Sequence, residues 1–422
     1  MSDGSGGGRA REPAREAATP AGILPYGRQD VTEADIEAVL AVLRSPWLTQ
    51  GPKIAEFESA IAARCEVPHA VAVNSATAAL HIACRALGVG PGDWVWTSPN
   101  TFVASANCAR YCGAEVDFVD IDPVTYNLCP QALADKLTRA QAGALPLPKV
   151  VIPVHFAGQP CDMGAIGALA EEYGFHVLED ASHAIGAHDG HSPVGACRHG
   201  DATVFSFHPV KIVTSGEGGA VTTRSAALAE RMRRLRTHGI VRDAGAQSWL
   251  YAQHELGYNY RMCDLQAALG ISQLTRLESY VRHRHALAER YDALLAGTGV
   301  TLPGRPGGSR SALHLYPILV GEGPTASALR ETVFIALRAA GIGVNVHYIP
   351  VHTQPYYRAR GHARDPLGNA LDYYARAISL PLFGAMTFEE QDRVVSALHE
   401  ALDGIAGREG TTPPLEAERR AA

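Results

Sequence analysis

Lysine is scarce in this chain. The 422 residues hold 37 lysines and arginines, and only four of these are lysines, namely Lys53, Lys136, Lys149 and Lys211. Arginine thus supplies most of the positive charge, so a lysine in an apolar setting asks for a specific reason. Lys211 stands between the apolar run 202–207 and the glycine-rich turn 215–219. Because a buried ammonium is costly unless it is paired, neutral or covalently bonded, Lys211 is either such a group or a surface-loop lysine.

Several classes of protein are disfavoured by features that the sequence lacks. No apolar run reaches the ~20 residues of a membrane-spanning helix, and residues 1–22 have no apolar core of the kind that a secretory signal needs. The net charge is −6 and no block of basic residues occurs, which argues against nucleic acid as a partner. We therefore expect a cytoplasmic protein with no membrane and no nucleic-acid partner.

Metal-binding signatures are also missing. The eight cysteines form no CxxC pair, and the histidines between residues 183 and 208 have a spacing that fits no zinc motif. Most cysteines lie in apolar segments, where a free thiol behaves as a small hydrophobic side chain, and a reducing compartment is expected. The sequence therefore predicts no metal site.

What the sequence does contain is an alternation of β-type runs and helical patterns from residue 69 to residue 223. This rhythm predicts an α/β fold with a mostly parallel central sheet covered by helices on both faces. Long helical segments are expected over 225–295, followed by strands near 313–319 and 343–348 and a final helix over 387–405. The expected domains are a disordered tail over 1–22, a large α/β domain over 23–280, a smaller C-terminal α+β domain over 281–406 and a second disordered tail over 407–422.

Ligands of such a sheet bind at the carboxyl ends of its strands, and four stretches of interest fall there. Residues 74–80 place small and hydroxyl side chains at a helix start, which suits either a bound phosphate or capping by Ser75 or Thr77. Residues 98–102 place Phe102 at the same edge, where its ring either stacks on a flat ligand or packs in the core.

The other two stretches carry the charged groups. In residues 178–183, strand alternation puts Glu179 and Asp180 on opposite sides of the sheet, so only one of them faces a given site. Asp180 is either a helix cap or a carboxylate that holds a proton on a ring nitrogen, with His183 close by. Near Lys211, the hydroxyl of Ser206 comes first, and glycines at 216, 218 and 219 allow a tight turn with close backbone approach.

A lysine amine, a carboxylate, an aromatic face and an anion cradle together suit pyridoxal phosphate (PLP). A carboxylate keeps the pyridine nitrogen protonated, so that the ring accepts electrons, and a lysine bonds covalently to the cofactor. Covalent attachment also explains a lysine in an apolar setting. Once a substrate amine has replaced it, the free lysine is the natural base for proton transfer.

At these residues the chain resembles the DegT/StrS-type sugar aminotransferases, over residues 23–405. The stretches that carry the resemblance are residues 179–183, 201–211, 216–219, 255–262 and 343–352. The resemblance implies a fold-type I PLP-dependent transferase. It also implies that Lys211 is the Schiff-base lysine, that Asp180 pairs with the ring nitrogen and that His183 lies near the phenolic oxygen. The cofactor would further be held by Phe102 on its ring face and by Ala76, Thr77 and Ser206 at its phosphate.

The resemblance further implies a homodimer with active sites at the interface, in which Asn259 reaches the phosphate bound by the partner subunit. Judged from the residues alone, Asn259 lies in an ordinary loop before a helix. His347, Tyr348 and His352 are expected either to contact the substrate or to pack within the small domain.

Within the family, residues 155–163 and 346–357 are similar to the branch that serves pseudaminic acid synthesis. This implies transfer of an amino group from an amino acid, with L-glutamate expected, to C4 of a UDP-linked 4-keto-6-deoxy-N-acetylhexosamine. Another nucleotide-linked keto sugar, such as a dTDP-hexose, and a non-catalytic PLP-binding regulator are the alternatives. A related dehydratase branch carries histidine where Lys211 stands, so the lysine favours transamination.

Overall fold

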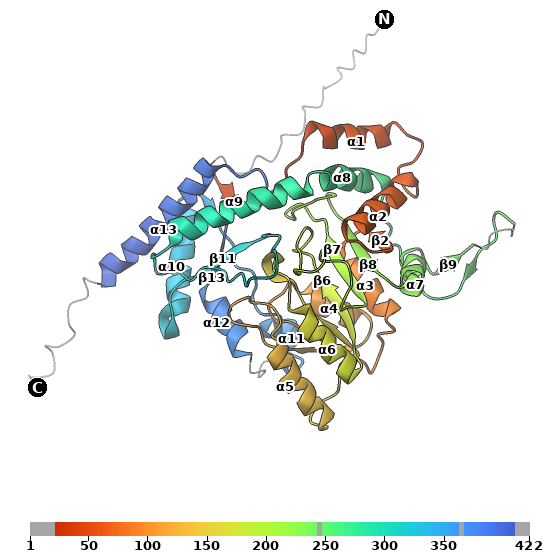
Figure 1. Cartoon of the computed structure of the whole chain (residues 1–422), viewed down its shortest axis with the longest axis horizontal. Coiled ribbons are helices and arrows are strands. Elements are labelled where there is room, and N and C mark those ends of the chain that lie inside the picture. The colour runs from red at the N-terminus through yellow and green to blue at the C-terminus, as the bar shows by residue number, and fades with distance from the viewer. Residues whose placement is uncertain (1–21, 243–246, 363–366, 410–422) are drawn as a thin grey trace, which may run out of the picture.

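The protein, described by a computed structural model, is placed over residues 22–242, 247–362 and 367–409. Most of both expected tails lies outside these ranges. At the centre is a seven-stranded sheet with the strand order β2-β8-β7-β6-β5-β3-β4 (Figure 1). Its strands are β2 (His69–Val73), β3 (Trp94–Thr97), β4 (Glu115–Phe118), β5 (Val150–Ile152), β6 (His176–Asp180), β7 (Ala202–Ser206) and β8 (Gly219–Thr223). Among these strands only β8 has the reversed direction, so it is antiparallel to β2 and β7 while the other pairs are parallel. The expected mostly parallel sheet is therefore confirmed.

Helices cover both faces of this sheet because successive strand residues point to opposite sides. On one face, Val71 and Val73 of β2 pack with α3 (Ala76–Ala86), α4 (Ala104–Tyr111) and α7 (Ala226–Arg236). On the other face, Ala70 and Ala72 pack with α2 (Pro52–Arg64) and α8 (Asp264–Leu274), against which α1 (Glu33–Leu43) lies. Farther along that second face, α5 (Pro130–Gln141) and α6 (Met163–Tyr173) cover Trp96, Val151 and Val177.

The C-terminal part of the chain forms a second, smaller core. Its antiparallel pair is β11 (Tyr316–Leu319) and β13 (Ala377–Leu380), and a short parallel pair joins β1 (Leu24–Pro25) to β12 (Ile342–Gly343). The helices α9 (Leu277–Leu295), α10 (Ala326–Ala339) and α13 (Phe388–Glu409) pack in this core, whereas the buried residues of α11 (Pro355–Arg358) and α12 (Gly368–Arg376) belong to the core of the large sheet. Since α9 runs without a break through residues 280 and 281, the expected domain boundary falls inside a helix and stays a prediction.

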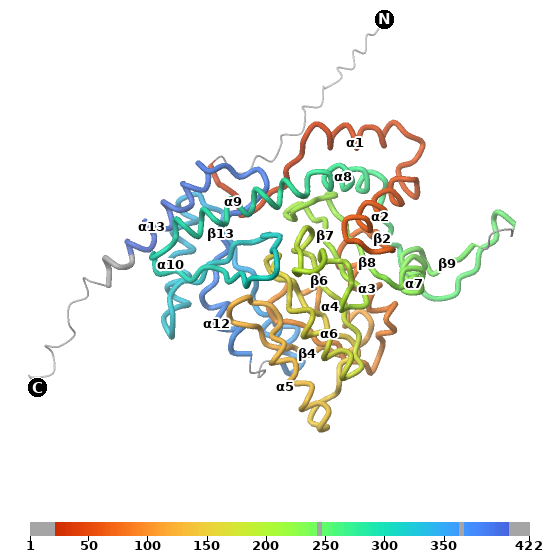
Figure 2. The backbone as a smooth tube through the Cα atoms, viewed as in Figure 1, coloured from red at the N-terminus to blue at the C-terminus, as the bar shows by residue number. Residues whose placement is uncertain are grey.

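Long helical segments dominate residues 225–295 as expected, namely α7, α8 and α9, but they are interrupted between α7 and α8. After α7 the chain forms a two-stranded ladder of β9 (Ile240–Val241) and β10 (Ala252–Gln253), in a segment that projects from the body (Figure 2). Gly239 has φ +72°, and a Cβ built there would lie 1.8 Å from the carbonyl oxygen of Glu255. The two backbone segments therefore cross with no room for a side chain at position 239. The expected strand at 343–348 is wrong apart from Gly343, because β12 spans Ile342–Gly343 and only an isolated bridge between Asn345 and Ser379 follows it.

Membrane-spanning helices, metal clusters and cysteines were each assessed over the described residues only. None of their helices combines the length and the apolar character that crossing a bilayer requires. No group of three or more His, Cys, Asp or Glu side chains among them is arranged to hold a metal ion. The eight cysteines are free thiols and most are buried, as expected of small hydrophobic side chains.

Candidate active site

A cavity of about 720 Å³ opens at the carboxyl ends of β6 and β7, between the sheet and the segment that follows β12. A space of this size fits a cofactor together with part of a substrate. Its lining includes most of the residues singled out from the sequence: Ala76, Thr77, Phe102, Asp180, His183, Ser206, Lys211, His347 and Tyr348.

One wall of the cavity is the first turn of α3. Ser75 caps this helix, because the backbone N–H of Ala78 donates to its Oγ at 3.1 Å. The capping alternative for Ser75 therefore holds, but Ala76 and Thr77 still present the start of the helix to the cavity. Gly219 allows β8 to lie against this turn, since a Cβ built there would come within 2.5 Å of the backbone of Ser75. A helix start of this kind favours a bound phosphate.

The two adjacent carboxylates of β6 face opposite sides, as alternation predicts. Asp180 lines the cavity, where its Oδ1 accepts from the backbone N–H of Ser182 at 3.0 Å and its Oδ2 from the hydroxyl of Ser105 at 2.7 Å. Residues 181–187 form turns with no α-helix, so the helix-cap alternative for Asp180 is wrong. Asp180 is instead a buried carboxylate aimed at a ligand site.

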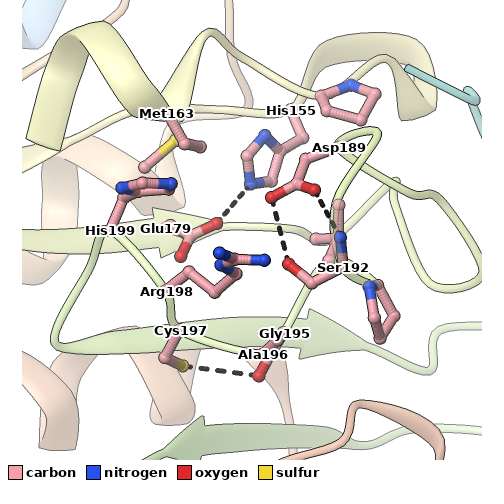
Figure 3. A pocket seen from close by; sticks show the side chains of 13 residues that line it. His155, Met163, Glu179, Asp189, Ser192, Gly195, Ala196, Cys197, Arg198 and His199 are labelled. Carbon is pink, nitrogen blue, oxygen red and sulfur yellow. Dashed lines mark hydrogen bonds and ion pairs between the residues drawn. The ribbon is translucent and has the colours of Figure 1, made fainter. Parts of the chain in front are cut away.

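Glu179 belongs to the reverse face of the same strand. Its Oε2 lies 2.8 Å from Nε2 of His155, and its Oε1 accepts from the hydroxyl of Thr203 at 3.0 Å. Figure 3 shows this contact with His155 at the edge of a small cavity, which has a volume of about 10 Å³. A cavity of that size admits one water molecule at most, so the surroundings of Glu179 leave no room for a ligand and its contacts are structural.

Lys211 follows β7 and lines the same cavity as Asp180. Burial lowers the pKa of its amine to about 8, although the nearby Asp180 carboxylate acts in the opposite direction. An amine of this kind is partly neutral near neutral pH, which suits a nucleophile or a base. Lys211 is half-buried on its loop and lines the cavity, which favours a ligand-facing lysine over the surface-loop alternative.

Three further rings surround the position between Lys211 and Asp180. His183 is buried, and its Nε2 lies 3.1 Å from the hydroxyl of Tyr348. Burial, reinforced by Lys211 and His347, holds the pKa of His183 well below its usual range, so the imidazole is neutral. Its Nδ1 is buried and has no hydrogen-bond partner within the described residues. A buried ring nitrogen without a partner indicates that a ligand atom belongs beside it.

Phe102 is 60 % exposed although it is a large apolar side chain, and it lines the cavity. The core alternative for this residue is therefore wrong. Its ring lies 6.3 Å from that of Tyr348, measured between centroids. An uncovered aromatic face at the mouth of a cavity suits stacking on a flat ring.

Two predicted site residues lie elsewhere. His352 is buried against the ring of Phe118 and does not line the cavity, which agrees with the packing alternative. Asn259 is exposed on the loop before α8, where it pairs with Thr237 and is likewise outside this cavity. An exposed position leaves Asn259 available to a neighbouring subunit.

The sequence reasoning missed several residues of the site. Tyr26 lines the cavity because β1 pairs with β12, which sets its ring 5.2 Å from that of His347. Asn345 follows β12 into the same wall. Ser105 touches Asp180 from α4. No local pattern signals Tyr26, because its partners are more than three hundred residues away. Ser105 stands one helical turn after Phe102, so its position near the site could have been predicted from the sequence.

The residues that meet in this cavity fit pyridoxal phosphate. The start of α3 and Ser206 suit the phosphate, Asp180 the ring nitrogen and Phe102 a ring face, and the unpartnered Nδ1 of His183 suits a polar atom on the ring. Lys211 provides the amine for covalent attachment.

The chain is similar to known proteins over nearly its whole described length. Residues 29–399 match the DegT/DnrJ/EryC1/StrS aminotransferase family. The spore coat polysaccharide biosynthesis protein SpsC of Bacillus subtilis is 41% identical over 390 residues, which are 90% of this chain and 98% of SpsC.

Two solved structures are similar over nearly the whole chain. Spr1654 of Streptococcus pneumoniae in its PLP form has a TM-score of 0.82 at 30% identity, covering 91% of this chain and 99% of its own. Helicobacter pylori PseC, an aminotransferase of pseudaminic acid synthesis, has a TM-score of 0.82 at 29% identity, covering 90% and 100%. The fold is thus fold-type I and the cofactor is pyridoxal phosphate, and the chain belongs to the DegT/DnrJ/EryC1/StrS aminotransferase family.

Proposed function

We propose that this enzyme transfers an amino group from an amino acid, with L-glutamate as donor, to C4 of a UDP-linked 4-keto-6-deoxy-N-acetylhexosamine. That is the reaction of a UDP-4-amino-4,6-dideoxy-N-acetyl-β-L-altrosamine transaminase, and its product is a 4-amino sugar for pseudaminic acid-type synthesis. The observation that carries transamination is the presence of Lys211 and Asp180 in one cavity, below the exposed ring of Phe102. The likeness to PseC supports the choice of sugar.

The residues of the cavity hold the cofactor in one orientation. The first turn of α3 and the hydroxyl of Ser206 bind its phosphate, and Phe102 covers one ring face. Asp180 would hold a proton on the ring nitrogen, and the neutral His183, whose Nε2 is held by the hydroxyl of Tyr348, would lie beside the ring. When bound, pyridoxal phosphate supplies an electron sink for the bond that breaks at the amino-bearing carbon.

Lys211 performs the proton transfers. It would hold the cofactor covalently at rest, and its pKa of about 8 leaves the free amine able both to accept and to return a proton. The same amine would take the proton from the amino-bearing carbon of the donor and return it within the site, and would move a proton in the opposite direction for the keto sugar. Tyr26, His347 and Tyr348 form the wall opposite the sheet, where they contact the sugar.

The active enzyme is proposed to be a homodimer with shared sites. The single-chain cavity lacks Asn259, which is exposed on its own subunit. In the dimer Asn259 reaches the cofactor phosphate of the partner subunit. An Asn259→Ala variant should therefore bind PLP more weakly while its own cavity is intact, and sedimentation should show dimers. A monomer with full affinity for PLP would contradict the arrangement.

Absorbance spectroscopy tests the reaction directly. The purified enzyme with PLP should show the band of lysine-bound cofactor, which L-glutamate converts to the pyridoxamine form and one keto sugar restores. Lys211→Ala should show no such band, whereas Lys149→Ala, which alters a surface ion pair with Asp93, should behave as the wild type. Normal turnover by Lys211→Ala would refute the proposal.

A panel of acceptors then identifies the substrate. Restoration of the original spectrum by UDP-linked 4-keto-6-deoxy-N-acetylhexosamines, and not by dTDP-linked keto hexoses, is expected. Restoration by a dTDP sugar instead would assign a different nucleotide sugar to the same site. Formation of the lysine-bound band with no change on addition of any amino donor would favour a non-catalytic PLP-binding regulator.

A further inference from the structure

A short series of hydroxyl groups ends on the carboxylate of Asp180. The Oγ of Ser105 lies 2.7 Å from Oδ2 of Asp180, and the Oγ1 of Thr101 lies 2.7 Å from the Oγ of Ser105. Ser105 is fully buried, and Thr101 and Asp180 are 3 % and 4 % exposed. Thr101 lies in the turn before α4 and Ser105 in the first turn of α4, on either side of Phe102. One turn of the chain thus supplies both the ring-facing aromatic and the neighbours of the carboxylate.

The direction of these hydrogen bonds follows from chemistry. An ionised carboxylate only accepts, so Ser105 must donate its single proton to Asp180. Thr101 must then donate to Ser105, whose proton is already used. The other acceptor near Ser105 is the carbonyl oxygen of Phe102, and its distance of 3.4 Å makes it a weak competitor. Both hydroxyl dipoles therefore point toward Asp180, and the hydrogen bond from Thr101 to Ser105 strengthens the one from Ser105 to Asp180.

The second oxygen of Asp180 is held from the other side. Its Oδ1 accepts from the backbone N–H of Ser182 at 3.0 Å. Each carboxylate oxygen thus has one protein donor, and the remaining acceptor capacity of Asp180 is left for the cavity that it lines. Donors to a carboxylate stabilise its charged form, which in a buried site opposes the cost of desolvation.

We propose that Ser105, supported by Thr101, is a positioning residue that fixes the orientation of the Asp180 carboxylate toward the ring nitrogen of the cofactor. The inference rests on the proposed role of Asp180 and adds the group that makes this role effective. Without the hydroxyl of Ser105, Oδ2 of Asp180 loses its donor and the carboxylate is free to turn away from the ring nitrogen, whose protonation is then less favoured. The ring then withdraws electrons less strongly.

Two variants of Ser105 and one control separate this role from simple packing. Ser105→Ala removes the donor, and Ser105→Thr retains a hydroxyl at the same place. Thr97→Val is the matched control, because the buried hydroxyl of Thr97 donates to the carbonyl of Ile152 at 2.8 Å and does not contact Asp180. Thr101→Val removes only the second hydroxyl.

Two measurements on the purified protein report on the ring nitrogen without any sugar substrate. The first is the dissociation constant of PLP, which Ser105→Ala should raise about tenfold, as expected for loss of a hydrogen bond to a charged group. The second is the pH midpoint of the absorbance change of bound PLP. A protonated ring nitrogen lowers this midpoint by withdrawing electrons from the bond to Lys211, so Ser105→Ala should raise it.

The other variants complete the expected pattern. Ser105→Thr should return both values toward the wild type, and Thr101→Val should shift both in the same direction as Ser105→Ala but less. Thr97→Val should lower the melting temperature and leave both values unchanged. If Ser105→Ala does not fold, the shift in Thr101→Val decides the question.

The inference is overturned if Ser105→Ala, or Thr101→Val in its place, changes neither the affinity for PLP nor the pH midpoint. Asp180→Asn distinguishes that outcome from a wider failure. Loss of affinity in Asp180→Asn alone would leave the role of Asp180 intact and refute only the role of Ser105. If Asp180→Asn also behaves as the wild type, the role proposed for Asp180 is itself wrong.

Discussion

Glu179 and Asp180 are adjacent residues of β6, carry the same charged group and are buried to nearly the same extent, at 5 % and 4 % exposure. Each accepts two hydrogen bonds from the protein at 3.0 Å or less. They differ in the space beside them. Asp180 faces a cavity of about 720 Å³, whereas Glu179 borders one of about 10 Å³. The available volume and the remaining acceptor capacity therefore separate a ligand-binding carboxylate from a structural one.

The largest effect is expected for Asp180→Asn. An amide cannot hold a proton on the ring nitrogen, so kcat should fall on the order of 10²–10⁴-fold, the range of a lost acid–base contribution. The melting temperature of the protein without cofactor should change little. Steady-state kinetics and thermal unfolding of the same preparation measure the two effects. Nearly normal kcat would remove the distinction between the two carboxylates.

A second large effect concerns the amine of Lys211. Only a neutral amine reacts with an acylating reagent, so in the protein without cofactor Lys211 should react with a midpoint near pH 8. Asp180→Asn removes the charge that raises the pKa of Lys211, so its midpoint should fall below 8, whereas Glu179→Gln should leave it in place. Competitive labelling read by mass spectrometry provides the values. Equal midpoints in both variants would contradict the expected proximity of Asp180 to Lys211.

Glu179→Gln should have the reverse profile of Asp180→Asn. The amide leaves either His155 or Thr203 without an acceptor in a buried site, which costs about 1–3 kcal/mol in the free energy of unfolding. Denaturant titration of the protein without cofactor measures this loss. The kcat of the folded enzyme should stay close to the wild-type value, and a large fall in kcat with unchanged stability would show that Glu179 acts in the reaction.

The smallest effect is expected for Thr203→Val, which removes one neutral donor to Glu179 and keeps the shape of the side chain. Loss of this hydrogen bond should reduce the free energy of unfolding by about 0.5–1.5 kcal/mol. The affinity for PLP should not change. A reduced affinity at unchanged stability would mean that the two faces of β6 are coupled.

The opposite placement of Glu179 and Asp180 was predictable because the side-chain period of a strand is two. The parallel sheet and the glycine-rich turn after Lys211 were likewise visible in local patterns. The partners of the two carboxylates were not, since His155 and Ser105 come from other elements and meet β6 only after folding. The roles assigned to the site residues stay predictions, although the structure brings most of them to one cavity.

The segment after α7 shows another kind of structure that sequence patterns could not predict. No sequence pattern predicted the β9–β10 ladder between α7 and α8, and the turn beside it depends on contact between Gly239 and residues near Gly257. A contact between two loop glycines leaves no periodic trace in the sequence. Local patterns therefore predicted the regular elements better than the connections between them.

The pairing of β1 with β12 has a consequence for how the enzyme is made. More than three hundred residues separate Pro25 from Ile342, and Tyr26 faces the wall formed after β12. On a ribosome that adds roughly 5–20 residues per second, the first strand waits on the order of a quarter to one minute for its partner. The sheet that carries Lys211 is complete well before then. A nascent chain therefore holds the sheet half of its active site before the opposite wall has been synthesised.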